Sequence, residues 1–151
     1  MLRVRTQFLR RSLFVFAVVL LSACASTPKG AYVKPVDGVV TSGFGARRGG
    51  PHYGVDIGAP RGTAVRASQA GRVVFRGRKR GFGRLLIVDH GGGVQTYYAH
   101  LSGYNVRKGK RVKRGQQIGR VGKSGRASGY HLHFELRMDG RPVNPVGVVP
   151  F

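Results

Sequence analysis

The segment His131-Leu132-His133-Phe134-Glu135 carries the side chains of this chain that are best suited to chemistry. Side chains alternate between the two faces of an extended strand, so the two histidines and the glutamate point to one side. Leu132 and Phe134 point to the other side and have the apolar character of a protein core. The pattern predicts a strand with one chemically active face and one packed face.

A second pair of candidate ligands lies upstream, where His52 and Asp56 are four residues apart. Extended backbone places both on the same side, and Gly54 between them allows the chain to bend toward a metal without a Cβ clash. A catalytic zinc ion usually has three protein ligands and keeps a fourth position for water. Each pair alone is also typical of hydrogen-bonded strand histidines. Together they supply three zinc ligands and leave one histidine beside the metal.

Five short segments, taken in their order along the chain, form a highly specific pattern. Through them the chain resembles the M23 zinc metallopeptidases. These lysostaphin-like or LytM-type domains cut peptidoglycan cross-links. The resemblance covers about residues 35–145. It implies that His52, Asp56 and His133 hold one zinc ion per chain, and that His100 and His131 are a catalytic pair that stays off the metal. The matching segments are Ser42–Gly45, His52–Ile57, Gly62–Val65, Tyr97–Ser102 and Gly129–Glu135.

The residue types agree with the implied reaction. Zinc lowers the pKa of water toward about 7 and polarises a peptide carbonyl, and a neutral imidazole can move the proton to the leaving amine. We assign the base role to His131, which shares a strand with His133, and expect His100 to orient it or to stabilise the oxyanion. The sequence leaves these two roles interchangeable. Glu135 is either a hydrogen-bond partner of a histidine ring or a surface glutamate.

One departure from the family concerns an upstream tyrosine that helps to stabilise the oxyanion in some members. Residues 34–51 contain no tyrosine, and the nearest aromatic residue is Phe44. Either Tyr53, Tyr98 or Tyr130 takes its place, or His100 acts alone. The departure bears on the rate of the reaction more than on its class.

The rest of the chain reads as short strands joined by glycine-rich turns, with no amphipathic helix after the first residues. A hairpin across the three glycines at 91–93 places His90 at a turn, where a structural role is expected. The predicted fold is all-β, an antiparallel sheet or sandwich with short loops. The resemblance implies the lysostaphin-like (duplicated hybrid motif) type over residues 35–151, with the site in a groove over the sheet. The expected strands are residues 70–76, 85–89, 94–100, 112–121 and 131–138.

Residues 1–23 have the features of a targeting segment, with four arginines before an apolar run of nine residues, Leu13–Leu21. That run is short for a membrane span, which needs about 20 apolar residues. Leu21–Cys24 resembles a bacterial lipobox with cleavage before Cys24, the only cysteine of the chain. An ordinary signal peptide that contains a cysteine is the alternative. We expect a lipidated tether over residues 24–34 and a lipid-anchored protein of the cell envelope. With Ala25 after the cysteine, it would be sorted to the outer membrane, facing the periplasm, in a cell with two membranes.

The chain is strongly basic, with 27 Lys and Arg against five Asp and Glu and a net charge of +22. Without the four arginines of residues 1–23, 23 basic residues remain against five acids, a net charge of +18. An exported lipoprotein rarely meets nucleic acid, so we expect anionic envelope polymers as partners instead. The densest basic stretches, Arg76–Arg84 and Arg107–Arg114, either grip such polymers or are solvated charge without a partner.

These observations predict a zinc-dependent endopeptidase that cuts peptide cross-links of peptidoglycan and is anchored to a membrane. The alternative is a non-enzymatic LytM-type activator of a cell-wall amidase. Relatives of that kind have usually lost metal ligands, whereas this chain retains three ligands and two further histidines. Glycyl bridges and D-alanyl-diaminopimelate cross-links are both cut within the family, and the sequence leaves the bond open.

Overall fold

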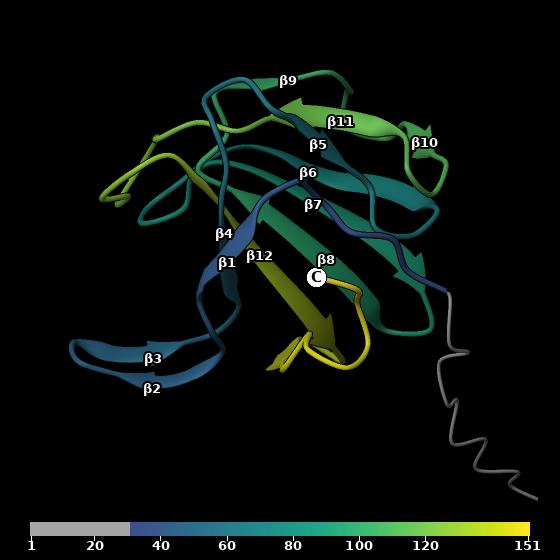
Figure 1. Ribbon diagram of the computed structural model, residues 1–151. Helices are drawn as coiled ribbons and strands as arrows, with labels where there is room; N and C mark the ends of the chain where they lie inside the picture. The colour runs from purple at the N-terminus through teal and green to yellow at the C-terminus, as the bar shows by residue number, and fades with distance from the viewer. Residues whose placement is uncertain (1–30) are drawn as a thin grey trace, which may run out of the picture.

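The computed structural model describes residues 31–151, which form thirteen strands and no helix (Figure 1). In this part of the chain, no helix has the length and apolar character to span a membrane. The predicted signal segment 1–23 and the predicted lipidation site Cys24 lie outside the described residues. The all-β prediction is confirmed.

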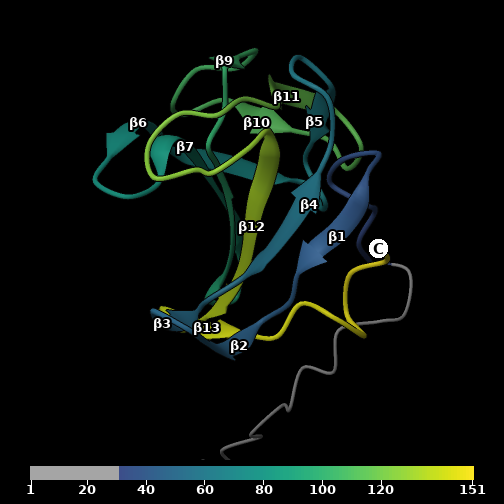
Figure 2. The same cartoon turned by 60° about the vertical axis from the view of Figure 1, so that its left-hand side comes forward.

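One large antiparallel sheet of eight strands forms the body of the fold. Its order is β1-β4-β12-β8-β7-β6-β10, and β13 pairs with β12 beyond the end of β4. Figure 2 shows β1, β4 and β12 side by side. The strands of this sheet are β1 (Val39–Ser42), β4 (Val55–Gly58), β6 (Gly71–Lys79), β7 (Gly83–Gly91), β8 (Val94–Ala99), β10 (Arg111–Val112), β12 (His131–Met138) and β13 (Arg141–Val143).

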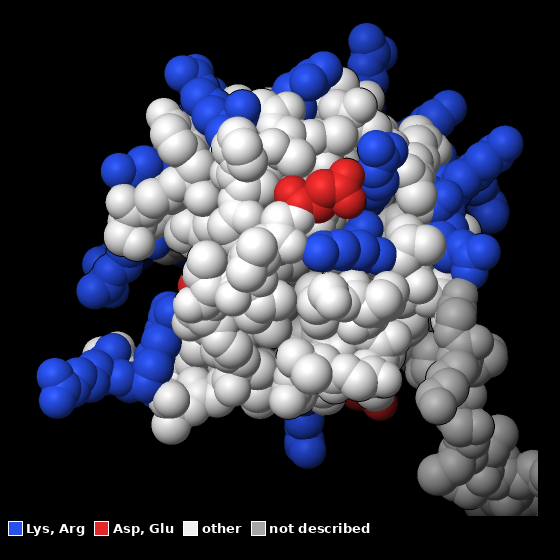
Figure 3. Space-filling view, in the orientation of Figure 1, with Lys and Arg blue, Asp and Glu red and all other residues white. Residues whose placement is uncertain are grey.

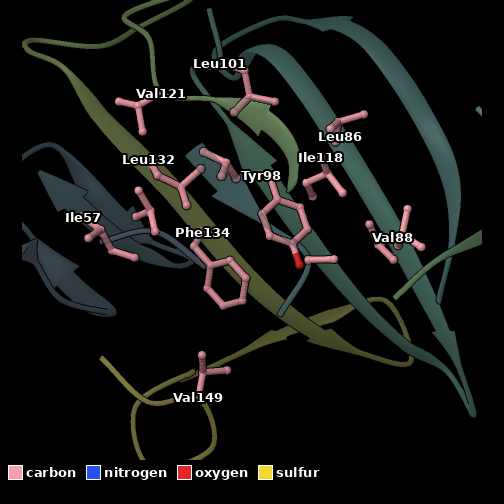
Figure 4. Packing of buried hydrophobic residues seen from close by; sticks show 14 of the residues in the cluster. Ile57, Leu86, Val88, Tyr98, Leu101, Ile118, Val121, Leu132, Phe134 and Val149 are labelled. Carbon is pink, nitrogen blue, oxygen red and sulfur yellow. The ribbon is translucent and has the colours of Figure 1, made fainter. Parts of the chain in front are cut away.

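Two smaller sheets complete the fold. A three-stranded sheet has the order β5-β11-β9, and β2 and β3 form a hairpin of their own. Buried side chains from the large sheet and from the three-stranded sheet share one core, in which Ile118 faces Leu86 and Tyr98 (Figure 4). The strands are β5 (Ala64–Arg66), β9 (Gly103–Tyr104), β11 (Gln117–Arg120), β2 (Gly45–Arg47) and β3 (Gly50–His52).

The alternation predicted for residues 131–138 is confirmed by β12, which has these bounds. Leu132, Phe134 and Leu136 are fully buried in the core. The ring of Phe134 meets that of Tyr98 edge-on, with 5.4 Å between the centroids. The core face of β12 therefore fixes which side chains of the strand face the opposite side.

Two strand predictions differ from the structure. Residues 112–121 are two strands, because the chain turns at residues 113–116 with Gly115 at φ +78°, and β10 and β11 join different sheets. The strand expected over 94–100 ends at Ala99, and His100 follows with φ +60°. The expected hairpin over the three glycines is confirmed as β7 and β8.

The residues just before position 35, expected to be tether, pack against the fold. Tyr32 is 4% exposed and belongs to the core. The amide of Val33 donates to the carbonyl of Ser68. Residues 32 and 33 are therefore part of the fold, beside the start of β6.

Candidate metal centre

The three predicted metal ligands meet at one end of the large sheet. Asp56 on β4 and His133 on β12 are directly opposite each other in the strand pair, and His52 ends β3. His52 Nε2 lies 3.1 Å from both Asp56 Oδ1 and His133 Nδ1, and the last two atoms are 2.8 Å apart. All three side chains are nearly buried. Residues 81 positions apart in the sequence thus present three donor atoms to one point.

This donor set fits a zinc ion. Two imidazole nitrogens and one carboxylate oxygen are ligands that zinc prefers, and bonds of about 2.0–2.1 Å in a tetrahedron place ligand atoms roughly 3.3 Å apart. The three atoms here are separated by 2.8–3.1 Å and lie within 4.8 Å of one another. Zinc held by three protein ligands would keep a fourth position for water or substrate.

Gly54 allows β4 to approach β12. A Cβ atom at this position would lie 2.2 Å from the backbone oxygen of Phe134, which no side chain tolerates. The sequence suggested that this glycine lets the chain bend toward the metal. The structure shows which clash the glycine avoids: a side chain here would meet the backbone of Phe134 on β12, next to the paired residues Asp56 and His133.

Hydrogen bonds on the outer side orient the ligand rings. Nδ1 of His52 donates to the carbonyl of Gly43 at 2.6 Å, which leaves Nε2 with its lone pair toward the ligand cluster. Nε2 of His133 lies 3.0 Å from Glu135 Oε1, and this carboxylate is 1% exposed. Arg137 donates to the other oxygen of Glu135 at 2.7 Å. The arginine compensates the buried charge, so the carboxylate can hold the His133 ring in one orientation.

Replacing Glu135 by glutamine is expected to weaken zinc binding by about 10–100-fold, because partners of ligand histidines contribute on that scale. Glutamine keeps the size of the side chain but cannot offer a charged acceptor to the His133 ring. Competition with a chromogenic zinc chelator measures the affinity. An unchanged affinity in a variant that melts at the parent temperature would show that Glu135 has only a structural role.

Asp56 is held in its ionised form. Burial alone raises the pKa of this carboxyl, but the hydrogen bond and charge of His133 outweigh burial and hold the pKa well below its usual value. The guanidinium of Arg47 lies 3.3 Å from Asp56 Oδ2, the oxygen that points away from His52 and His133. Arg47 was not foreseen as a site residue, because only the β2–β3 hairpin brings it over the ligand cluster.

His131 and His100 stand beside the ligands with their rings 4.8 Å apart. His131 Nε2 lies 3.7 Å from Asp56 Oδ1, and its Nδ1 faces the carbonyl of Gly129 at 3.1 Å. His100 Nδ1 donates to the carbonyl of Ser124 at 2.8 Å, and burial lowers the pKa of His100 to about 4. A neutral imidazole that donates through Nδ1 has Nε2 as its proton acceptor.

A cleft opens over these histidines. Phe82, Arg126 and Ser128 line it beside the predicted residues, and the Phe82 ring packs against His133 at 5.8 Å. Sequence reasoning missed these three residues because they lie on loops that approach the metal centre only after folding. Arg47 and Arg126 give the cleft a basic rim.

The three tyrosines considered as oxyanion groups have different locations. Tyr53 is half exposed and lines the cleft. Tyr98 is excluded, because it is fully buried on the opposite face of the sheet, where its hydroxyl contacts the amide of Ser68 and the hydroxyl of Thr96. Tyr130 is half exposed and is not among the residues that line the cleft.

His90 lies apart from the cleft, near the end of β7. Its Nδ1 faces the carbonyl of Ala70 at 2.8 Å, and its Nε2 faces the hydroxyl of Thr96 at 2.7 Å. Both ring nitrogens are thus occupied by protein groups. This environment agrees with the structural role expected from the sequence.

The family model of peptidase family M23 matches residues 50–145, the part of the chain that contains the three predicted ligands and the two predicted catalytic histidines. The chain belongs to peptidase family M23. Over 97 residues it is 50% identical to the DD-carboxypeptidase/endopeptidase Mpg of Neisseria meningitidis, a match that covers 64% of this chain and 22% of that protein. It is 40% identical to the murein hydrolase activator NlpD of Escherichia coli, over 83% of this chain and 33% of NlpD. The chain therefore spans a third or less of these relatives.

Solved structures of peptidases share the fold. A zinc-containing peptidase from Vibrio cholerae superposes with a TM-score of 0.71 and 37% identity, covering 76% of this chain and 39% of that one. The catalytic domain of lysostaphin from Staphylococcus simulans gives a TM-score of 0.69 with 33% identity and covers 74% and 91%. The lysostaphin-like fold predicted for this M23 chain is confirmed.

Proposed function

We propose that this M23 protein is a zinc-dependent endopeptidase that cuts peptide cross-links of peptidoglycan. One observation carries the proposal: three ligand side chains and two further histidines, all of the types that the reaction needs, meet in a single cleft. The 50% identity with an enzyme named as a DD-carboxypeptidase/endopeptidase supports it.

In this proposal His52, Asp56 and His133 hold one zinc ion, which when bound would supply an activated water molecule and polarise the scissile carbonyl. His131 accepts the proton of the attacking water at Nε2 and delivers it to the leaving amine. His100 keeps its neutral imidazole against His131, where it orients that ring or helps to stabilise the oxyanion. The roles of the two histidines are open to exchange.

The alternative function is activation of a cell-wall amidase without hydrolysis. The 40% identity with the murein hydrolase activator NlpD over most of this chain favours it. An activator that does not hydrolyse peptide bonds has no need of the complete ligand set. The retention of all three ligands makes the enzyme the better supported candidate.

The deciding experiment is mass spectrometry of muropeptides released from purified peptidoglycan. Zinc-loaded protein is expected to reduce cross-linked dimers and to produce a new pair of peptide ends that names the bond, while chelator-treated protein leaves the dimers intact. Intact dimers with zinc shown to be bound would contradict the enzymatic proposal. Release of peptides by an added amidase, only in the presence of this protein, would then establish the activator.

We propose that the protein works in the cell envelope, anchored by a lipid on Cys24. Cys24→Ser is expected to shift the protein from the membrane fraction to the soluble fraction, since stable anchoring depends on the acyl chains. Fractionation followed by immunoblotting measures the shift. Membrane association that withstands both the substitution and a high-salt wash would contradict the lipid anchor.

We further propose that the first basic stretch, Arg76–Arg84, contacts anionic wall polymer beside the cleft. Gly81 and Phe82, at the tip between β6 and β7, line the cleft. Arg76, Arg78, Lys79 and Arg80 on this stretch are exposed. A polyanion seated at the cleft would therefore meet these cations.

A further inference from the structure

The second basic stretch lies at the other edge of the large sheet. β10 is the outermost strand of the order β1-β4-β12-β8-β7-β6-β10, so three strands separate it from β12, which carries His131 and His133. Four strand spacings correspond to roughly 19 Å. We call this edge the β10 basic edge; it consists of Arg72, Arg107, Lys108, Lys110, Arg111, Lys113 and Arg114, all exposed.

Two arginines of the β10 basic edge face each other directly. Arg111 on β10 is the cross-strand partner of Arg72 on β6, and like charges in this position destabilise a strand pair. Within residues 31–151, no carboxylate forms an ion pair with either of them. Asp89, opposite Arg72 on the next strand, is occupied by the amide of Gly91 and the side chain of Gln95. Arg72 donates to the carbonyl of Gly109 at 3.1 Å, a neutral partner, so the pair has hydrogen bonding but no ion-pair partner among the described residues.

The described chain begins beside this edge. The ring of Tyr32 packs edge-on against His90 at 6.3 Å, and His90 lines one hollow together with Arg72 and Arg111. Six residues, 25–30, lie between the predicted lipidation site and residue 31, which makes seven Cα–Cα steps from Cys24 to residue 31. Even fully extended, they span at most about 25 Å. A lipid on Cys24 would hold the β10 basic edge close to the membrane.

Basic residues outnumber acidic ones on this part of the surface, where Asp89 lines the hollow together with Arg72 and Arg111. Figure 3 shows Lys and Arg side chains gathered over the region where Figure 1 places β10. Between Asp89 and Glu135 the sequence contains no acidic residue. Basic clusters next to a membrane attachment point are attracted by anionic headgroups within a Debye length, about 8 Å at physiological salt.

We propose that the β10 basic edge binds the anionic lipid headgroups of the membrane to which the chain is attached. The inference rests on the proposed lipid anchor for its orientation, but the binding itself requires neither the anchor nor hydrolysis. With this edge on the membrane, the metal cleft lies at the far side of the sheet and opens away from the bilayer. The two basic stretches then have different partners, wall polymer at the cleft and lipid at β10.

The test uses the zinc-loaded protein of residues 25–151, which contains all described strands and lacks the lipid. It is sedimented with vesicles of phosphatidylcholine that contain 30% phosphatidylglycerol, or with phosphatidylcholine alone. Arg72→Gln/Arg111→Gln is compared with Arg78→Gln/Arg80→Gln, which removes the same charge from the other stretch. We expect binding to the anionic vesicles only, weakened about 25-fold by the first pair and less than threefold by the control.

Equal losses in the two double variants would overturn the proposal, because they would show attraction by net charge alone. Lys110→Gln/Lys113→Gln, at two exposed positions, gives a second variant if the arginine pair fails to fold by circular dichroism; it should also weaken binding about 25-fold. Isolated sacculi serve as the competing partner. Loss of sacculus binding with vesicle binding intact in the Arg72/Arg111 variant would assign the edge to the wall and overturn the proposal. Since sedimentation does not depend on cleavage, a failed endopeptidase assay leaves this result interpretable.

Discussion

His133→Ala is expected to abolish zinc binding and to lower cross-link cleavage by at least about 10³-fold, since a bound metal contributes several kcal/mol to transition-state stabilisation. His133 offers Nδ1 to the ligand cluster and holds the contact with Glu135. Alanine removes both, while Leu132 and Phe134 keep the core face of β12. Zinc content by atomic absorption and dimer cleavage by chromatography measure the two losses.

The matched control is another strand histidine whose contacts lie elsewhere. His90 contacts Ala70 and Thr96 and is remote from the ligand cluster. His90→Gln should keep one zinc ion per chain and cleave dimers at the parent rate, at some cost in thermal stability. If His133→Ala still bound zinc stoichiometrically and cleaved dimers, the proposed ligand set would be refuted.

Phe134→Ala, at the next residue of the same strand, is expected to lower the stability of the fold and to leave zinc binding intact. Its ring is fully buried and packs against Tyr98 and Phe151. Removing a buried phenylalanine ring costs about 3–5 kcal/mol, which should lower the Tm by more than about 10 °C in a domain of this size. Differential scanning calorimetry measures the change.

Below its lowered Tm, the Phe134→Ala protein should retain zinc, because the ligand atoms lie on the other face of the sheet. Val39→Ala provides the control, since Val39 is 74% exposed and truncation there should change stability by no more than about 0.5 kcal/mol. A Tm within 2 °C of the parent for Phe134→Ala would refute the packing role of this ring.

The two adjacent substitutions illustrate what a local pattern can predict. The period of two places neighbouring side chains of a strand on opposite faces, and this holds wherever the strand lies in the fold. The β12 strand, its core face and the β7–β8 hairpin could therefore be predicted from short stretches of sequence. Glu135 was placed on the face of His133 for the same reason, although only the structure shows the contact with Arg137 that compensates its charge.

Features that depend on distant partners could not be predicted in this way. Residues 112–121 have the composition of a strand, but β10 and β11 pair with different sheets, and only tertiary packing decides where the chain turns. Tyr98 was a candidate for the site until the sheet placed its hydroxyl against Ser68 and Thr96. Arg47 reaches Asp56 only because the β2–β3 hairpin folds over the cluster.

By itself, the sequence determined the residue types of the metal centre, the alternation of β12 and the excess of positive charge, because these are properties of composition and of spacing over a few residues. Tertiary structure alone decided which donor atoms meet, since His52 and His133 are 81 residues apart and come within 3.1 Å because β4, which follows His52 closely in the chain, pairs with β12. It also decided that one basic stretch borders the cleft and the other borders the first described residues of the chain. The sequence sets how much positive charge the chain carries, but the fold decides which parts of the surface carry it.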